Sequence, residues 1–119
     1  MDFNNRKKGD FGESVASREL VRKGYKILAR NFRLRSGEID IVAQKCNTIV
    51  FVEVKLRTNT QMGMPIEAVN LKKQKKIIET AKKYIYVNNI TGCDFRFDII
   101  EILLTDSIML RHTENAFWE

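Results

Sequence analysis

The chain has 119 residues, of which 44% are hydrophobic and 30% are charged, with one proline and six glycines. This composition predicts a single soluble globular domain over residues 1–119 and excludes a low-complexity chain. Lysine and arginine together outnumber aspartate and glutamate by 21 to 15, and the net charge of +6 favours a polyanionic partner, with nucleic acid as the first candidate.

Cysteine and histidine are too sparse for a zinc site, since Cys46, Cys93 and His112 are the only such residues. Two isolated cysteines are typical of a reducing compartment, where they remain thiols. The N-terminal segment lacks the apolar stretch of an export signal, and no segment approaches the roughly 18 apolar residues of a membrane span. We therefore expect a cytoplasmic protein without a membrane partner, and we expect residues 1–8 to be flexible.

The first predicted element is a helix over residues 10–24. Asp10 is a candidate N-cap, Glu13 stands where a capping box places an acid, and Gly24 ends the helix. Alternating apolar residues then predict three strands, at 25–34, 38–45 and 49–57, joined by short turns. Such short connections predict an antiparallel meander.

The second half of the chain begins with a loop over 58–65, in which Pro65 is placed to start a short helical turn through Val69. Residues 71–87 predict an amphipathic helix rich in lysine. Residues 93–104 predict a strong strand, and 108–118 a weaker edge strand or tail, in which His112 is interpreted as incidental. The helix permits a crossover, so we expect an α/β fold with a mixed sheet and helices on both faces.

Two charged residues interrupt the apolar strand "IVFVEVKLR". Because side chains alternate along a strand, Glu53 and Lys55 project to one face, whereas Val52, Val54 and Leu56 project to the other. Buried charges are costly unless they pair or bind a metal. The residues alone therefore leave two alternatives, a structural Glu53–Lys55 ion pair or a functional site.

Asp40 lies in the preceding predicted strand. Its position between Ile39 and Ile41 predicts a side chain that faces away from the isoleucines, and pairing across the short 46–48 turn brings it beside Glu53. Two carboxylates and an amine form the oxygen-rich, charge-balanced setting that Mg²⁺ or Mn²⁺ prefers. A lysine there can orient water or stabilise charge during phosphodiester hydrolysis, which predicts a nuclease-like site.

These residues resemble the PD-(D/E)XK nuclease superfamily. The segments "GDFGESVASRELVRKGYKILARNFR", "GEIDIVA", "VFVEVKLRT" and "FRFDII" are more narrowly similar to the YraN-type endonuclease-like family, which itself resembles archaeal Holliday junction resolvases. The resemblance covers most of residues 9–100 and implies the restriction endonuclease-like αβββαβ core. The chain departs from the superfamily pattern at Ile39, where the pattern has proline.

The resemblance also implies the roles of individual residues. The matching Asp40, Glu53 and Val54 carbonyl would bind Mg²⁺ or Mn²⁺, Lys55 would act on the attacking water, and Glu13 would support the site or bind a second ion. Gln74, with Lys75 as the alternative, resembles a residue that some members place near the site from the second helix.

Several of these residues have a simpler structural alternative. Glu13 could serve only the capping box, although it flanks Ala16 and Leu20 on a helical wheel, and Asp40 could be an ordinary solvent-side residue. The lysines of the second helix could form a solvated face, or they could grip phosphates together with nearby arginines. The candidates for such contacts are Arg33, Arg35, Arg57, Lys72, Lys73, Gln74, Lys75 and Lys76.

The sequence therefore predicts a Mg²⁺- or Mn²⁺-dependent endonuclease that hydrolyses DNA, in particular branched or structured DNA. The rival is a non-catalytic DNA-binding module that retains the fold. Two acids aimed at a polyanion favour the enzyme, because a protein that only binds phosphates gains nothing from them. A homodimer is compatible with branched substrates.

Overall fold

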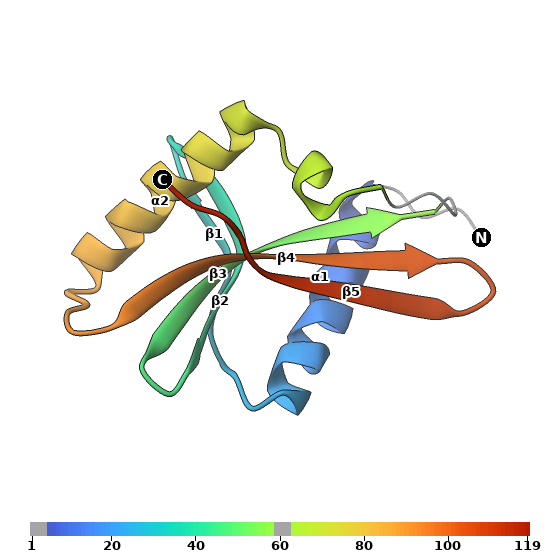
Figure 1. Cartoon of the computed structure of the whole chain (residues 1–119), viewed down its shortest axis with the longest axis horizontal. Coiled ribbons are helices and arrows are strands. Elements are labelled where there is room, and N and C mark those ends of the chain that lie inside the picture. The colour runs from blue at the N-terminus through green and yellow to red at the C-terminus, as the bar shows by residue number, and fades with distance from the viewer. Residues whose placement is uncertain (1–4, 59–62) are drawn as a thin grey trace.

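A computed structural model describes residues 5–58 and 63–119 (Figure 1). The elements follow in the order α1 (Asn5–Arg22), β1 (Lys26–Leu34), β2 (Gly37–Lys45), β3 (Thr48–Arg57), η1 (Pro65–Ala68), α2 (Leu71–Val87), β4 (Asp94–Leu104) and β5 (Ile108–Phe117). The predicted strands, the lysine-rich helix and the short turn after Pro65 are all present. The predicted 58–65 loop includes residues 59–62, which lie outside the described residues.

The five strands form one sheet in the order β1-β2-β3-β4-β5. The β1/β2 and β2/β3 pairs are antiparallel, which confirms the predicted meander. After α2 crosses the sheet, β4 runs parallel to β3, and β5 returns antiparallel to β4. The mixed sheet and the helices α1 and α2 on opposite faces confirm the restriction endonuclease-like α/β fold (Figure 1).

Each face of the sheet has its own hydrophobic core. On one face α2 packs through Ile77, Ile78, Ala81 and Tyr84 against a cluster centred on Phe51. On the other face α1 packs through Ala16 and Leu20 against residues such as Val52 and Ile100. A sheet covered on both faces buries most of its strand residues, which explains the nearly continuous apolar stretches of β3 and β4.

The first helix begins earlier than predicted. It starts at Asn5, so Asp10 is not its N-cap and Glu13 does not belong to a capping box. Residues 1–4 of the segment expected to be flexible lie outside the described residues, and residues 5–8 have a helical backbone. Position 13 instead falls on the face that packs on the sheet, because Glu13, Ala16 and Leu20 are spaced at helical intervals.

The turn between β1 and β2 contacts α2. Ser36 Oγ lies 2.8 Å from Thr80 Oγ1. A Cβ on Gly37 would stand 3.2 Å from the Lys76 Cβ, and the φ of +149° at this glycine is one that other residues rarely adopt. Glycine therefore lets the hairpin approach the helix, and this contact sets one wall of the groove described below.

The interpretation of His112 as incidental is wrong. Its side chain is only 3% exposed, its Nε2 lies 2.8 Å from Asp98 Oδ2, and its Nδ1 lies 2.8 Å from Lys23 Nζ. His112 thus links β5 to β4 and to Lys23, the residue that follows α1. Cys46 and Cys93 are free thiols, as expected.

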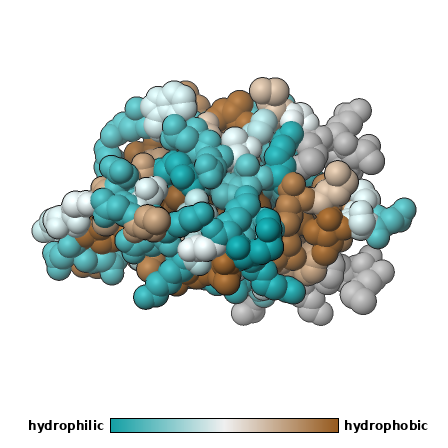
Figure 2. Space-filling model, turned by 60° about the horizontal axis from the view of Figure 1, so that its bottom comes forward, coloured by the Kyte–Doolittle hydropathy of each residue, from teal (hydrophilic) through white to brown (hydrophobic). Residues whose placement is uncertain are grey.

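The surface is mostly polar. Figure 2 shows hydrophilic side chains over most of the face that carries α1, with apolar atoms gathered toward the end where the β4–β5 hairpin lies. Ile108, Met109 and Leu110 are exposed at the start of β5. Within the ranges 5–58 and 63–119, no helix has the length and apolar character needed to cross a membrane.

Candidate active site

Asp40 lies where β2 and β3 separate. The backbone ladder between these strands runs from Lys45↔Thr48 to Ile41↔Val52 and ends there, one pair before Asp40 and Glu53. The next free donor on β3, the Val54 N–H, is bound by the Asp40 carboxylate, with 2.8 Å between N and Oδ2. A side chain thus replaces a backbone carbonyl in the ladder. Asp40 therefore sits near the plane of the sheet, within reach of both faces.

The predicted alternation of β2 fails at Asp40. Ile39 packs with the core under α2, whereas Ile41 and Ala43 pack with the core under α1. The prediction that Ile39 and Ile41 share a face is therefore wrong. The alternation of side chains between the two faces of the sheet is interrupted at Asp40. This interruption lets Asp40 reach a cleft although the isoleucines on both sides of it are buried.

Glu13 approaches the same place from α1. The residue is only 5% exposed, and its Oε1 atom is buried without a hydrogen-bond partner. Burial of a carboxylate oxygen without a hydrogen-bond partner destabilises the fold, because the oxygen loses its hydrogen bonds to water and forms none with the protein. An unpartnered buried acid marks a functional site more often than a structural one.

Glu53 projects from the face of β3 opposite to Val52 and Val54, as predicted, and this face is the one that α2 covers. It is buried, and its Oε1 lies 2.5 Å from the Nζ of Lys73 on α2. Lys55 shares this face but is exposed, and its charge acts on Glu53 from the neighbouring position. The structural alternative of a simple Glu53–Lys55 pair is therefore incomplete, since Lys73 is the lysine that contacts the acid.

Burial raises the pKa of each of the three acids, and the charge of a neighbouring acid adds to the rise at Asp40 and at Glu13. Burial, followed by the charge of Glu53, raises the pKa of Asp40 to about 7. Burial also raises the pKa of Glu53, against the opposing effect of Lys73, and burial followed by the charge of Asp40 raises the pKa of Glu13. Near neutral pH the Asp40 carboxyl therefore takes up a proton more readily than an exposed aspartate, because its surroundings do not fully compensate its negative charge.

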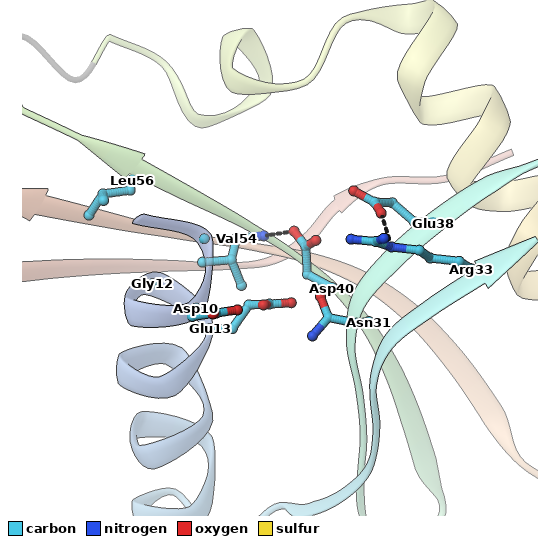
Figure 3. Close-up of a pocket in the computed structure, with 10 residues that line it drawn as sticks. Asp10, Gly12, Glu13, Asn31, Arg33, Glu38, Asp40, Val54 and Leu56 are labelled. Atoms are coloured by element: carbon cyan, nitrogen blue, oxygen red, sulfur yellow. Dashed lines mark hydrogen bonds and ion pairs between the residues drawn. The ribbon is translucent and has the colours of Figure 1, made fainter. Parts of the chain in front are cut away.

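An open cleft of about 960 Å³ borders the cluster on the α1 face. Figure 3 shows Glu13 and Asp40 approaching it from α1 and β2, with Val54 beside them and the Arg33–Glu38 ion pair at the rim. The lining residues are Gly9, Asp10, Gly12, Glu13, Asn31, Arg33, Glu38, Asp40, Val54 and Leu56. Glu53 and Lys55 do not line this cleft, because they lie on the other face of β3.

A smaller groove lies on the α2 side of the same sheet opening. Its lining residues are Gly37, Glu38, Asn70, Lys72, Lys73, Lys76 and Ile77. Glu38 lines both hollows, so the groove and the cleft meet at the end of β2 where Asp40 lies. One hollow is lined by acids and the other by lysines.

The donor set suits a hard divalent cation. Carboxylate oxygens with raised pKa values and an unpartnered Glu13 oxygen are the groups that Mg²⁺ or Mn²⁺ would stabilise. Within the described part of the chain, however, no three acidic, histidine or cysteine side chains form a ready metal cage. One oxygen of Asp40 is bound by Val54, and Lys73 neutralises Glu53. A divalent cation would therefore have to compete with the Lys73 ammonium for the Glu53 carboxylate.

The predicted phosphate-binding residues divide into two groups. Arg35, Lys72, Lys75 and Lys76 are exposed, and Arg33 is 72% exposed despite its pair with Glu38. Arg57 is instead turned toward the buried Glu101, with 3.0 Å between Nε and Oε2. Gln74 donates from Nε2 to the Val69 carbonyl and so closes the turn before α2. Leu71, the apolar first residue of α2, is exposed.

Two residues near the acids were not predicted to lie beside them. Lys73 was predicted only as a phosphate contact, and Asn31 was not singled out. No periodic signal distinguishes Lys73 from its lysine neighbours, because only the crossing of α2 over β3 decides which lysine meets Glu53. An asparagine inside the otherwise regular segment "ARNFR" was the one available sign for Asn31.

Fold and site together define an α/β protein of the restriction endonuclease-like class, with a carboxylate cluster where two strands separate. The model of the uncharacterised protein family UPF0102 matches residues 12–102, and the chain belongs to this family, known also as the YraN family. It is 51% identical to a UPF0102 protein of Clostridioides difficile (strain 630), over 97% of this chain and 100% of that one. It is 47% identical to a UPF0102 protein of Clostridium novyi (strain NT), over 95% and 97% of the two chains.

Proposed function

We propose that this protein is a metal-dependent endonuclease that hydrolyses DNA phosphodiester bonds with water as the nucleophile. The observation that carries the proposal is the position of Asp40 between Glu13 on the α1 face and Glu53 on the α2 face, with raised pKa values for all three acids and an unpartnered Glu13 oxygen. A purely structural cluster of acids would pair each of them with a cation, because uncompensated buried charge is destabilising.

The proposed roles follow from the positions of the side chains. Asp40, Glu53 and Glu13 would hold Mg²⁺ or Mn²⁺, together with the Val54 carbonyl that the family resemblance implies. The bound cation would lower the pKa of a coordinated water and neutralise charge on the phosphate. Lys55, exposed on the face of Glu53, would orient the attacking water or stabilise charge that develops on the phosphate oxygens.

The basic residues around the two hollows would hold the substrate backbone. Lys72 and Lys76 line the groove, and Arg33 lies at the rim of the cleft, so phosphates on both sides of the sheet opening have cations nearby. Such contacts carry no sequence information. We therefore propose recognition by DNA structure rather than by sequence, with branched DNA as the substrate that the family resemblance suggests.

The decisive experiment compares linear, nicked, flapped and four-way DNA, each incubated with and without Mg²⁺ or Mn²⁺. We expect cleavage only with the cation, and faster cleavage of the branched substrates. Lys55→Ala should reduce single-turnover cleavage by roughly 100-fold or more, as expected on removing a positioned proton-transfer or charge-stabilising group. Its melting temperature should change little, because Lys55 is exposed.

A second candidate function is DNA binding without cleavage. The observation that favours it is the Lys73–Glu53 ion pair, in which the protein's own cation already neutralises one of the three acids. Wild-type protein that binds these DNAs but cleaves none of them, nor any RNA, in Mn²⁺ would support this alternative. The same result would exclude the endonuclease.

A further inference from the structure

Asn31 has a left-handed backbone in the middle of a strand, with φ of 54°. Three other described residues besides glycines share a positive φ, and each has a local reason. Cys46 lies in the β2–β3 turn, Asn89 follows α2, and Asn115 lies at the irregular pairing of β5. Asn31 lies between Arg30↔Ile41 and Phe32↔Ile39, so no residue is inserted there and its partner across the strands is Asp40.

Both strands reverse their facing at this pair. Ala29 and Phe32 of β1 both pack with the core under α2, although residues three apart in a regular strand point to opposite faces. Ile39 and Val42 of β2 show the same departure. The reversal in each strand falls at the residues between, which include Asn31 and Asp40. A left-handed residue supplies the required change of backbone direction, and asparagine tolerates it better than other residues with a Cβ.

The Asn31 side chain also contacts the acid that arrives from α1. Figure 3 shows it at the cleft wall beside Asp40 and facing Glu13. Burial raises the pKa of Glu13 and the nearby Asn31 carboxamide opposes this rise, while Glu13 Oε1 keeps no hydrogen-bond partner. Asn31 therefore affects the positions of both acids. Its backbone conformation acts on Asp40, and its side chain acts on Glu13.

We propose that Asn31 is the positioning residue of the carboxylate cluster: its left-handed backbone turns Asp40 out of the strand alternation toward Val54 and the cleft, and its carboxamide holds Glu13. A strained conformation at a functional site is retained when it places a reacting group. The consequence for cation binding rests on the proposed function, whereas the orientation of Asp40 does not.

The test separates backbone from side chain with two variants. Asn31→Gly keeps the left-handed conformation and loses the carboxamide, and Asn31→Ala loses the carboxamide and disfavours the conformation. Asn89→Ala is the matched control, because Asn89 has nearly the same φ, 51°, at the end of α2 and away from the cleft. The readouts are amide hydrogen exchange at Val54, which reports the bond to Asp40, and calorimetric titration with Mn²⁺ alone.

We expect Asn31→Ala to lower the Val54 protection and the Mn²⁺ affinity by about tenfold or more each, the scale of one lost charge-assisted hydrogen bond. Asn31→Gly should keep the Val54 protection and weaken Mn²⁺ binding only severalfold, through Glu13. Asn89→Ala should lower the melting temperature and leave both readouts unchanged. Normal Val54 protection in Asn31→Gly together with reduced protection in Asn31→Ala could not result from a general loss of stability.

Wild-type Val54 protection in Asn31→Ala, or equal loss in Asn31→Gly, would overturn the proposal. If Asn31→Ala does not fold, Asn31→Ser replaces it, since serine also disfavours the left-handed conformation and must lower the Val54 protection. Wild-type protein that binds no Mn²⁺ would overturn the proposed function, while the exchange comparison would still decide the role of Asn31.

Discussion

Asp98 and Glu101 in β4 are as deeply buried as Glu13 and Glu53, yet their surroundings are opposite. Asp98 accepts two bonds from Arg96, one from the Asn115 N–H, and contacts His112. Glu101 is held by Arg57 and Arg111. Burial raises the pKa of Asp98, but the hydrogen bonds from His112 and Arg96 outweigh it and lower the pKa overall.

At the candidate site Asp40 instead lies between two other acids, Glu13 on the α1 face and Glu53 on the α2 face. Their pKa values rise, Glu13 keeps an unpartnered oxygen, and Lys73 is the only cation in contact with a carboxylate of the cluster among the described residues. The comparison shows that burial of an acid does not by itself indicate function. What distinguishes the site is the missing compensation, which a structural ion-pair network supplies.

The largest loss of stability is expected on mutation of Asp98, whose negative charge is fully compensated by its neighbours. Asp98→Asn removes the buried carboxylate that Arg96 and His112 contact and should lower the free energy of unfolding by about 3 kcal/mol, because loss of one member of a buried pair leaves the other charge uncompensated. Urea denaturation measures it. Glu114→Gln is the matched control: it meets the same Arg96 but is 58% exposed, so its effect should stay within about 0.5 kcal/mol. Equal stability of Asp98→Asn and wild type would break the comparison.

Removal of a negative charge from the candidate site should instead raise the free energy of unfolding. The folded pKa of Asp40, about 7, exceeds its ordinary value of 3.8, so the folded state binds the proton more tightly and loses stability as pH rises between these values. Asp40→Asn does not titrate and should therefore be more stable than wild type at pH 8. A difference of about three pKa units at about 1.4 kcal/mol per unit sets an upper value of about 4 kcal/mol. The weaker hydrogen bond of a neutral amide to the Val54 N–H offsets part of it, so we expect roughly 2 kcal/mol.

The measurement is thermal unfolding as a function of pH. The advantage of Asp40→Asn should shrink as pH falls and vanish near pH 4, where the wild-type carboxyl is protonated in the folded protein. Parallel curves for the two proteins from pH 4 to pH 8 would show that Asp40 is compensated in the way that Asp98 is.

The competition at Glu53 predicts a gain in cation affinity. Lys73→Gln removes the ammonium from Glu53 and should tighten Mn²⁺ binding about tenfold, or about 1.4 kcal/mol, by calorimetry. Lys75→Gln is the control, because Lys75 is an exposed residue of the same helix. If both variants bind Mn²⁺ like wild type, Lys73 and the cation do not share an acid.

The smallest expected effects concern DNA binding. Lys72→Gln and Lys76→Gln should each reduce the log-log slope of duplex affinity against salt by about 0.9, the value for one phosphate contact. Arg57→Gln should instead lower stability and leave the salt slope unchanged, because Arg57 is committed to Glu101. A changed salt slope in Arg57→Gln would indicate that Arg57 contacts DNA rather than serving only the ion pair with Glu101.

The sequence by itself determined the architecture. Periodicity of two and of 3.6 specified four of the strands and α2, short turns specified the antiparallel meander, and the length of α2 allowed the parallel return of β4. These features depend on residues close together in the chain. For the same reason the sequence placed Asp40 and Glu53 next to each other, since one short turn sets their register.

Only the tertiary structure decided how the acids are compensated. Which lysine of α2 meets Glu53 depends on how the helix crosses β3, and the partner of Asp98 comes from a strand that local pattern marked as a tail. The start of α1 at Asn5 and the reversal of β2 at Asp40 likewise depend on contacts beyond the local sequence. Ion pairs and strained residues form between elements distant in the chain, so no local periodicity encodes them.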